Sequence, residues 1–135
     1  MLAPALGIVR LSLHVTAAAV WVGGQIVLAG LVPTLRKGAD AQLVRAAAQR
    51  FARLAWPAFV VLIATGLWNI AAVHPSRQTT AWRVVFGVKM AVVVLAGVAT
   101  ARHQAAKSRA GLAVWGALSG TAALAALVLG VAIAG

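Results

Sequence analysis

The chain has 135 residues, of which 63% are hydrophobic and only 10% charged, and its net charge is +11 with Asp40 as the single acid. One core could not bury so much apolar surface, so the composition excludes an ordinary soluble domain. The basic residues occupy short segments between apolar runs, a pattern typical of membrane topology that argues against nucleic-acid binding. Because the chain has no cysteine, disulfides, zinc–thiolate sites and iron–sulfur clusters are excluded as well.

Four apolar stretches are long enough to cross the hydrocarbon core of a bilayer, which takes about 20 residues in a helix. They cover approximately residues 6–35, 54–73, 82–101 and 111–133. Backbone groups in lipid must be paired within the segment, so each stretch is predicted to be a helix. We therefore expect an all-α fold, a four-helix transmembrane bundle forming a single domain over 1–135, with the first helix retained and not cleaved as a signal.

Positive charge predicts the orientation of the helices. Eight basic residues lie in the first and third connections: Arg36, Lys37, Arg45, Arg50, Arg53, Arg102, Lys107 and Arg109. The other side carries Arg10, Arg77 and Arg83. This asymmetry predicts a multi-pass protein of the bacterial inner (plasma) membrane with both termini extracytoplasmic. The first connection can form a short amphipathic helix whose bases lie near anionic headgroups of the bilayer, the partner that the sequence predicts most directly.

Polar residues inside the spans are candidates for function because ionisable groups are costly in lipid. At 100° per residue Arg10, His14, Trp21 and Gln25 fall within roughly a 60° arc of the first helix. This polar stripe is predicted to face the interior of the bundle.

The other spans add polar groups at a similar predicted depth near the outer surface. The candidate cofactor-binding residues are His14, Lys89, Arg10, Trp68 and Asn69. Structural roles are open for the same side chains: His14 could hydrogen-bond a threonine or a carbonyl, Lys89 could snorkel, and Trp68 could anchor at the interface.

Several short segments resemble the copper resistance D (CopD) domain family of bacterial inner-membrane proteins. They are Leu13-His14, Trp21-Val22-Gly23-Gly24, Arg50-Phe51-Ala52-Arg53-Leu54-Ala55, Thr65-Gly66-Leu67-Trp68 and Trp82-Arg83-Val84-Val85-Phe86-Gly87-Val88-Lys89. The resemblance spans roughly residues 10–103 and implies a helical bundle involved in copper transport or tolerance. Copper(I) favours thiolate and thioether ligands, and imidazole suits either copper state. The candidate metal ligands are therefore His14, His74 and Met90.

The chain is also similar to the HemJ-like protoporphyrinogen oxidases. The matching residues are His14, Pro57, Thr65-Gly66 and Lys89. This resemblance implies haem b, or porphyrin chemistry, with His14 as axial ligand. It also implies that Lys89 ligates opposite His14, or that Lys89 or Arg10 pairs a propionate. The aromatic and acidic features of that family's fourth helix are missing here.

Three functions follow from these observations. The leading hypothesis is a CopD-like protein that handles copper. The first alternative is a haem b-binding protein or porphyrin oxidase. The second is a non-catalytic accessory subunit whose small-residue faces contact a membrane-protein partner or a second copy of the chain. No catalytic residue is assigned, and the balance is against an enzyme. Hydrolytic chemistry in particular is nearly excluded, because the single acid, Asp40, lies in a predicted cytoplasmic loop.

Overall fold

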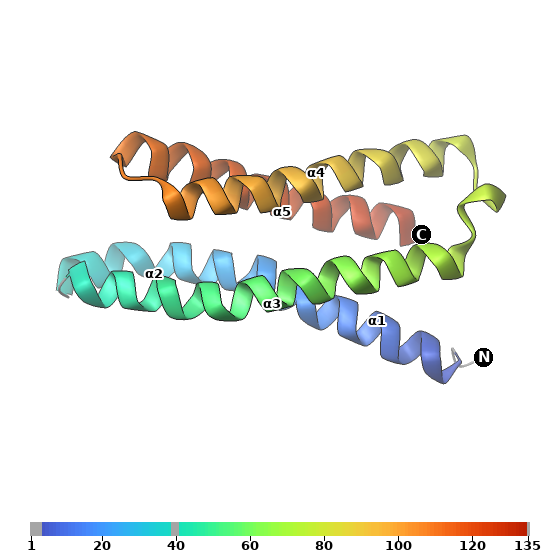
Figure 1. The fold of residues 1–135 in the computed structure, drawn as a ribbon, viewed down its shortest axis with the longest axis horizontal. Coiled ribbons are helices and arrows are strands. Elements are labelled where there is room, and N and C mark those ends of the chain that lie inside the picture. Colours follow the sequence, from blue (N-terminus) through green and yellow to red (C-terminus); the bar gives the residue numbers. More distant parts are fainter. Residues whose placement is uncertain (1–3, 39–40, 135) are drawn as a thin grey trace. The chain divides into compact units, whose positions relative to one another are not determined.

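The structure, a computed structural model, describes residues 4–38 and 41–134 (Figure 1). In this part of the chain, four helical stretches are long and apolar enough to cross a membrane. They are Ala5–Gly38, Ala41–Val73, Thr80–Ala105 and Arg109–Ala134. The all-α class and the four apolar helices are thus confirmed. The chain forms two compact units, Met1–Val73 and His74–Gly135, and each is a pair of helices.

The first helical stretch is interrupted by a π turn. It consists of α1 (Ala5–Ala18), the π-helical segment η1 (Ala19–Gly23) and α2 (Gly24–Gly38). A π turn holds one extra residue, so the face of the helix beyond it is rotated by about 100° relative to a regular α-helix. The polar arc expected from a uniform 100° step therefore applies to Arg10 and His14 on α1, but it cannot be extended through η1 to Gln25.

The second helical stretch is longer than expected. A span over 54–73 was predicted, with a separate short helix before it, but α3 runs without a break over Ala41–Val73. The alanine-rich segment that follows Arg45 favours helix strongly, and no glycine or proline interrupts it before Pro57. At 1.5 Å per residue α3 is about 50 Å long, whereas the bilayer core is about 30 Å thick.

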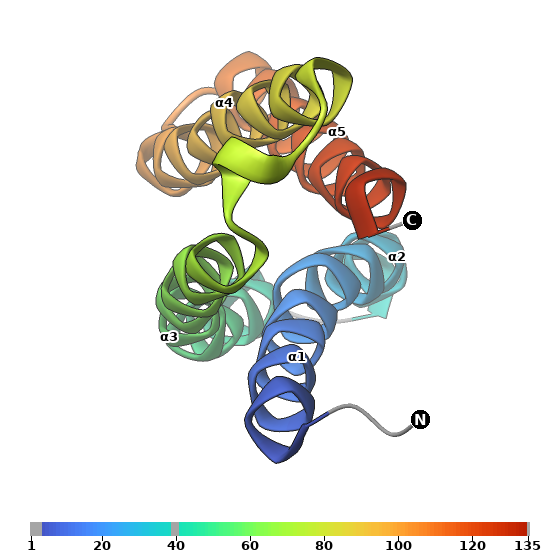
Figure 2. The same cartoon turned by 90° about the vertical axis from the view of Figure 1, so that its right-hand side faces the viewer.

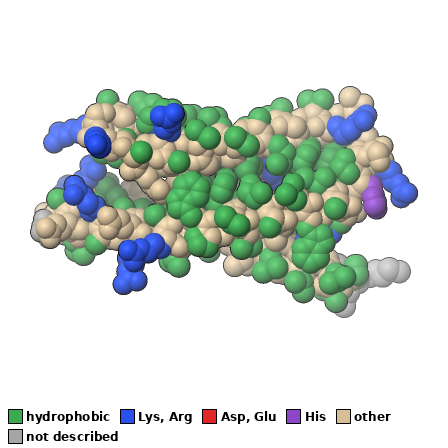
Figure 3. Space-filling model, viewed as in Figure 1, with side chains coloured by type: hydrophobic (Ala, Val, Ile, Leu, Met, Phe, Trp, Pro, Cys, Tyr) green, Lys and Arg blue, Asp and Glu red, His purple; other side chains and the backbone are tan. Residues whose placement is uncertain are grey.

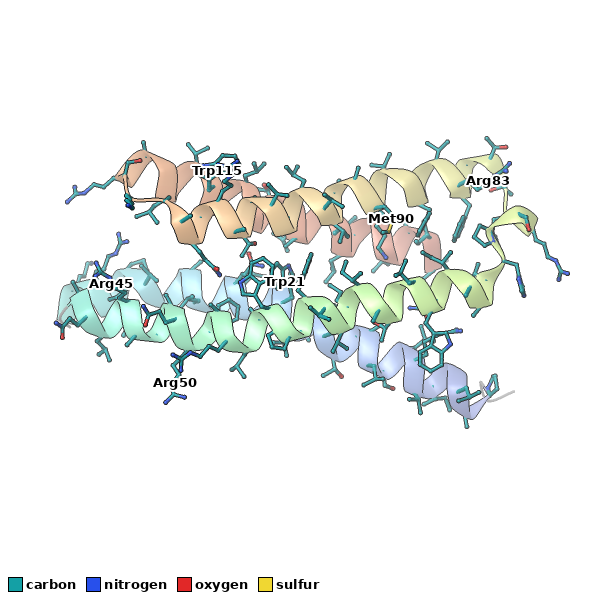
Figure 4. The ribbon with its side chains drawn as sticks, in the orientation of Figure 1. Trp21, Arg45, Arg50, Arg83, Met90 and Trp115 are labelled. Atoms are coloured by element: carbon teal, nitrogen blue, oxygen red, sulfur yellow. The ribbon has the colours of Figure 1, made fainter. Side chains whose placement is uncertain are left out.

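The N-terminal part of α3 therefore continues beyond the apolar span and carries arginines. Arg45 and Arg50 point to opposite sides of the first unit (Figure 4), as expected for residues five positions apart on a helix. Basic side chains lie mainly toward helix ends, while hydrophobic side chains cover the helix lengths (Figure 3). Asp40 lies outside the described residues.

An aromatic cluster joins η1 to α3 in the first unit. Trp21 is only 2% exposed, and its ring centroid lies 4.4 Å from that of Phe59 and 5.6 Å from that of Trp56. Offset and edge-on pairs at such distances add to the stability gained from burying the rings. Next to this cluster, Gly24 lies directly against the Phe51 ring, so α2 and α3 approach closely there.

The second unit is a hairpin of α4 (Thr80–Ala105) and α5 (Arg109–Ala134), preceded by the 3₁₀ turn η2 (Pro75–Arg77) (Figure 2). Small buried residues line the contact between the two helices: Ala96, Gly97, Ala99, Ala122 and Ala123. Small side chains allow helix backbones to pack closely, which is the usual basis of helix association in lipid.

Two polar contacts tie the α4–α5 hairpin together. The buried hydroxyls of Thr100 and Ser119 lie 2.6 Å apart, and Thr100 Oγ1 also donates to the Ala96 carbonyl at 2.8 Å. Since a hydroxyl has one hydrogen, both contacts are satisfied together when Ser119 donates to Thr100. Nearer the loop, His103 Nδ1 donates to the Leu112 carbonyl at 2.9 Å.

The adjacent glycines of the first unit provide a matched test of this packing. A Cβ at Gly24 would overlap the Phe51 ring, whereas a Cβ at Gly23 would meet nothing within 4 Å. We expect Gly24→Ala to lower the free energy of unfolding by about 1–3 kcal/mol, the usual cost of overpacking. Gly23→Ala should leave it unchanged or raise it slightly, because alanine favours helix. Thermal unfolding in detergent measures both, and equal midpoints for the two variants would contradict the packing described.

Candidate functional site

The candidate site of the first unit is built on a hydrogen bond between α1 and α3. His14 Nδ1 lies 2.9 Å from Thr65 Oγ1, and Thr65 is buried with 5% of its surface exposed. Thr65 Oγ1 in turn lies 2.7 Å from the Val61 carbonyl and 3.2 Å from the Leu62 carbonyl, to which it donates. The half-buried His14 side chain is thus directed at α3 and not away from the protein.

These contacts favour one position for the proton of His14. The single hydrogen of the Thr65 hydroxyl is used toward the carbonyls of its own helix, as is common for threonine inside a helix. All three contacts are satisfied together when Thr65 Oγ1 accepts from Nδ1–H of His14. In the neutral imidazole the lone pair then lies on Nε2, the nitrogen through which His14 would ligate. A histidine whose second nitrogen is held in this way is the usual form of a metal-binding imidazole.

Gly66 leaves room for the imidazole on α3. A Cβ at this position would lie 3.5 Å from His14 Cε1, which is ordinary van der Waals contact. The ring therefore packs beside the surface of α3 at Gly66. The expectation that His14 could bond a threonine is confirmed, and Thr65 is that partner.

Arg10 and Asn69 carry buried polar atoms that have no hydrogen-bond partner. The atoms are Arg10 Nε and Asn69 Oδ1, and no other hydrogen bond of either side chain occurs among residues 4–38 and 41–134. The same part of the chain holds no acidic residue, so Arg10 has no carboxylate to pair with there. Such a positive group is a functional candidate in an apolar segment.

Trp68 differs from Thr65 and Asn69 on α3 because its side chain is 43% exposed. Its indole is not part of the core of the first unit, in contrast to the buried Trp21. This exposure is compatible with the interfacial role considered for Trp68 and provides no independent support for cofactor binding.

Lys89 belongs to the second unit and lies against α5. A Cβ at Gly130 would come within 3.0 Å of Lys89 Nζ, so the ammonium occupies the space that a side chain would fill there. Gly130 lies near the C-terminal end of α5, where a helix attracts cations. About two turns before Lys89 on α4, Trp82 also contacts α5. Its Nε1 donates to the Ile133 carbonyl at 3.1 Å, and its ring stacks on that of Phe86.

The three candidate metal ligands are not gathered in either unit alone. His14 is in the first unit, while exposed His74, with a left-handed φ of 51°, and Met90 on α4 belong to the second (Figure 4). Among the described residues, no group of three histidine, cysteine or acidic side chains could hold a metal ion. A joint site of His14 with His74, Met90 or Lys89 stays a prediction.

Sequence reasoning did not assign Thr65 to the site and did not anticipate the π turn. The sequence does contain features that could have identified Thr65. This residue faces His14 when the first two spans run antiparallel, and the glycine that follows it leaves room for the imidazole. The π turn has no such signal, because Ala19–Gly23 contains no residue type specific to that geometry.

The chain matches no protein-family model, and no similar curated protein or solved structure was found. The CopD-like and HemJ-like resemblances therefore rest on the sequence motifs alone and stay predictions.

Replacement of Thr65 tests the hydrogen bond with His14. Thr65→Val keeps the shape but removes the acceptor, leaving the His14 N–H without its partner, so we expect the free energy of unfolding to fall by about 1–3 kcal/mol. Thr65→Ser keeps the hydroxyl, so its free energy of unfolding should fall by less than that of Thr65→Val. Chemical denaturation of the full chain in detergent measures the difference, and a valine variant as stable as the serine variant would argue against the bond.

Proposed function

We propose that the chain is an integral membrane protein that binds haem b, or a porphyrin metal complex of the same type, through His14. The observation that supports this most directly is the Thr65–His14 hydrogen bond, because an Nδ1–H that donates to Thr65 places the lone pair of the neutral ring on Nε2. A haem requires only one or two axial ligands from the protein because the porphyrin supplies the other four nitrogens. Bound haem would supply redox chemistry, and the residues of the chain would hold and orient it.

The charge of the described residues also suits this group. They contain no acid, and Arg10 has an unpartnered Nε buried on α1. Haem b carries two carboxylates, so a site with cations and no carboxylates complements its charge. The donor set and the charge thus fit a haem.

We further propose that the four apolar helices cross the bacterial inner membrane with both termini extracytoplasmic. The support is the excess of arginine and lysine in the first and third connections. In this orientation the arginines at the N-terminal end of α3 lie on the cytoplasmic side, close to anionic lipid headgroups.

Copper handling is the second candidate function. The same Nε2 lone pair suits either oxidation state of copper. A bare ion, however, needs two to four protein ligands, and the first unit offers a single imidazole. Copper would therefore require ligands from the second unit or from a partner protein, which is why we rank this function below haem binding.

The test is an optical spectrum and metal analysis of the full chain purified in detergent after expression with excess haem precursor. We expect a Soret band and about one iron per chain. The band should disappear in His14→Gly and return when imidazole is added, because free imidazole can replace the missing side chain. His103→Gln is the control, since no candidate site includes His103 and a glutamine amide keeps a donor for the Leu112 carbonyl.

Each outcome assigns one function. A Soret band that depends on His14 and is rescued by imidazole supports haem binding. Colourless protein that retains copper favours the second candidate. Protein with neither iron nor copper that co-purifies with a stable partner would overturn both and favour an accessory subunit.

A further inference from the structure

Arg10 and Asn69 occupy equivalent positions on two antiparallel helices. In the first unit α3 runs opposite to α1 (Figure 1), and His14 on α1 contacts Thr65 on α3. Four residues before His14 is Arg10, and four residues after Thr65 is Asn69. Because residues four apart share a helix face, both lie about one turn, or about 6 Å, from the His14–Thr65 pair and in the same direction.

Both side chains lack the partners that buried polar groups normally have. Arg10 Nε and Asn69 Oδ1 are buried, and neither residue has a hydrogen bond with another residue in the described ranges. More than nine in ten buried polar groups in folded proteins are paired, so two such orphans on the same side of the His14–Thr65 pair are unusual. Their arrangement calls for a polar group supplied from outside the described residues.

The chemistry of the two side chains defines that group. A guanidinium donates to carboxylate oxygens and stabilises their charge. The Asn69 amide, which is held by no hydrogen bond within the described residues, can turn to present either Oδ1 or Nδ2. A carboxylate accepts from Arg10 Nε and from Asn69 Nδ2 together, whereas a cation would be repelled by Arg10.

We propose that Arg10 and Asn69 form a subsite for a carboxylate of the ligand that His14 holds. This inference rests on the proposed function, and for haem b the carboxylate is a propionate. Arg10 and Lys89 were both candidates to pair this carboxylate, and the proposal assigns the role to Arg10. Lys89 Nζ lies against Gly130 near the C-terminal end of α5, a position that gives the ammonium a structural role.

Haem and its dimethyl ester test this subsite, because the ester keeps the iron and the ring but blocks both carboxylates. Binding to the full-length protein is followed by the Soret band and by quenching of tryptophan fluorescence. We expect wild type to prefer haem over the ester by about ten-fold, the usual contribution of one hydrogen bond to a charged group. Arg10→Gln should lose most of this preference while still binding the ester.

Asn69→Asp provides a second, independent variant. It places a carboxylate of the protein opposite Arg10, so the pair becomes internally satisfied. We expect it to raise the unfolding temperature of the protein without haem and to weaken haem binding, with binding of the ester little changed. A role confined to folding would not separate haem from its ester.

Matched controls make the outcomes distinct. Arg83→Gln removes an exposed arginine of α4, labelled in Figure 4, and should keep the full preference. Equal binding of haem and ester by wild type, or loss of the preference in Lys89→Met but not in Arg10→Gln, would overturn the subsite while leaving haem binding intact. Absence of any binding of haem or ester to wild type would instead overturn the proposed function.

Discussion

The hydrogen bond between His14 and Thr65 is the interaction on which the candidate site depends. It joins α1 to α3 at 2.9 Å, and the carbonyls of Val61 and Leu62 favour Nδ1–H of His14 as the donor because they can accept the hydroxyl hydrogen of Thr65. An imidazole placed in an apolar segment would otherwise be costly and free to choose its tautomer. The same contact therefore stabilises the helix pair and prepares Nε2 as a ligand.

Both units use the same arrangement for a polar contact between apolar helices. In each, the hydroxyl of a buried threonine contacts both the carbonyl four residues earlier and a side chain of the neighbouring helix: Thr65 contacts His14, and Thr100 contacts Ser119. Such a contact adds specificity where helix association has little hydrophobic driving force. The two contacts differ in the partner of the threonine. In the second unit the partner is a serine hydroxyl, whereas in the first unit it is an imidazole, whose second nitrogen carries the lone pair when Nδ1 is protonated.

Composition was sufficient to predict the helices, because four long apolar runs in a chain with almost no acids have few alternatives to spanning lipid. Their ends were harder to predict. The second apolar run begins only near Leu54. The helix α3 nevertheless begins at Ala41, because the alanine-rich segment before Leu54 favours helix although it is basic. The candidate site was predicted in part. His14 is half-buried, but its pairing with Thr65 depends on the antiparallel register of two helices. The π turn of η1 changes the helix face locally, which no uniform periodicity can capture.

The central claim concerns the tautomer of one imidazole, and nitrogen NMR measures it directly. The protein without haem, labelled with ¹⁵N-histidine and reconstituted in bilayers, gives separate signals for protonated and unprotonated ring nitrogens, and His14 is assigned by comparison with His14→Gly. At a pH where the ring is neutral, we expect His14 to carry its hydrogen on Nδ1 and its lone pair on Nε2. A hydrogen on Nε2 instead would mean that Thr65 donates to the ring, and the basis for ligation through Nε2 would be lost.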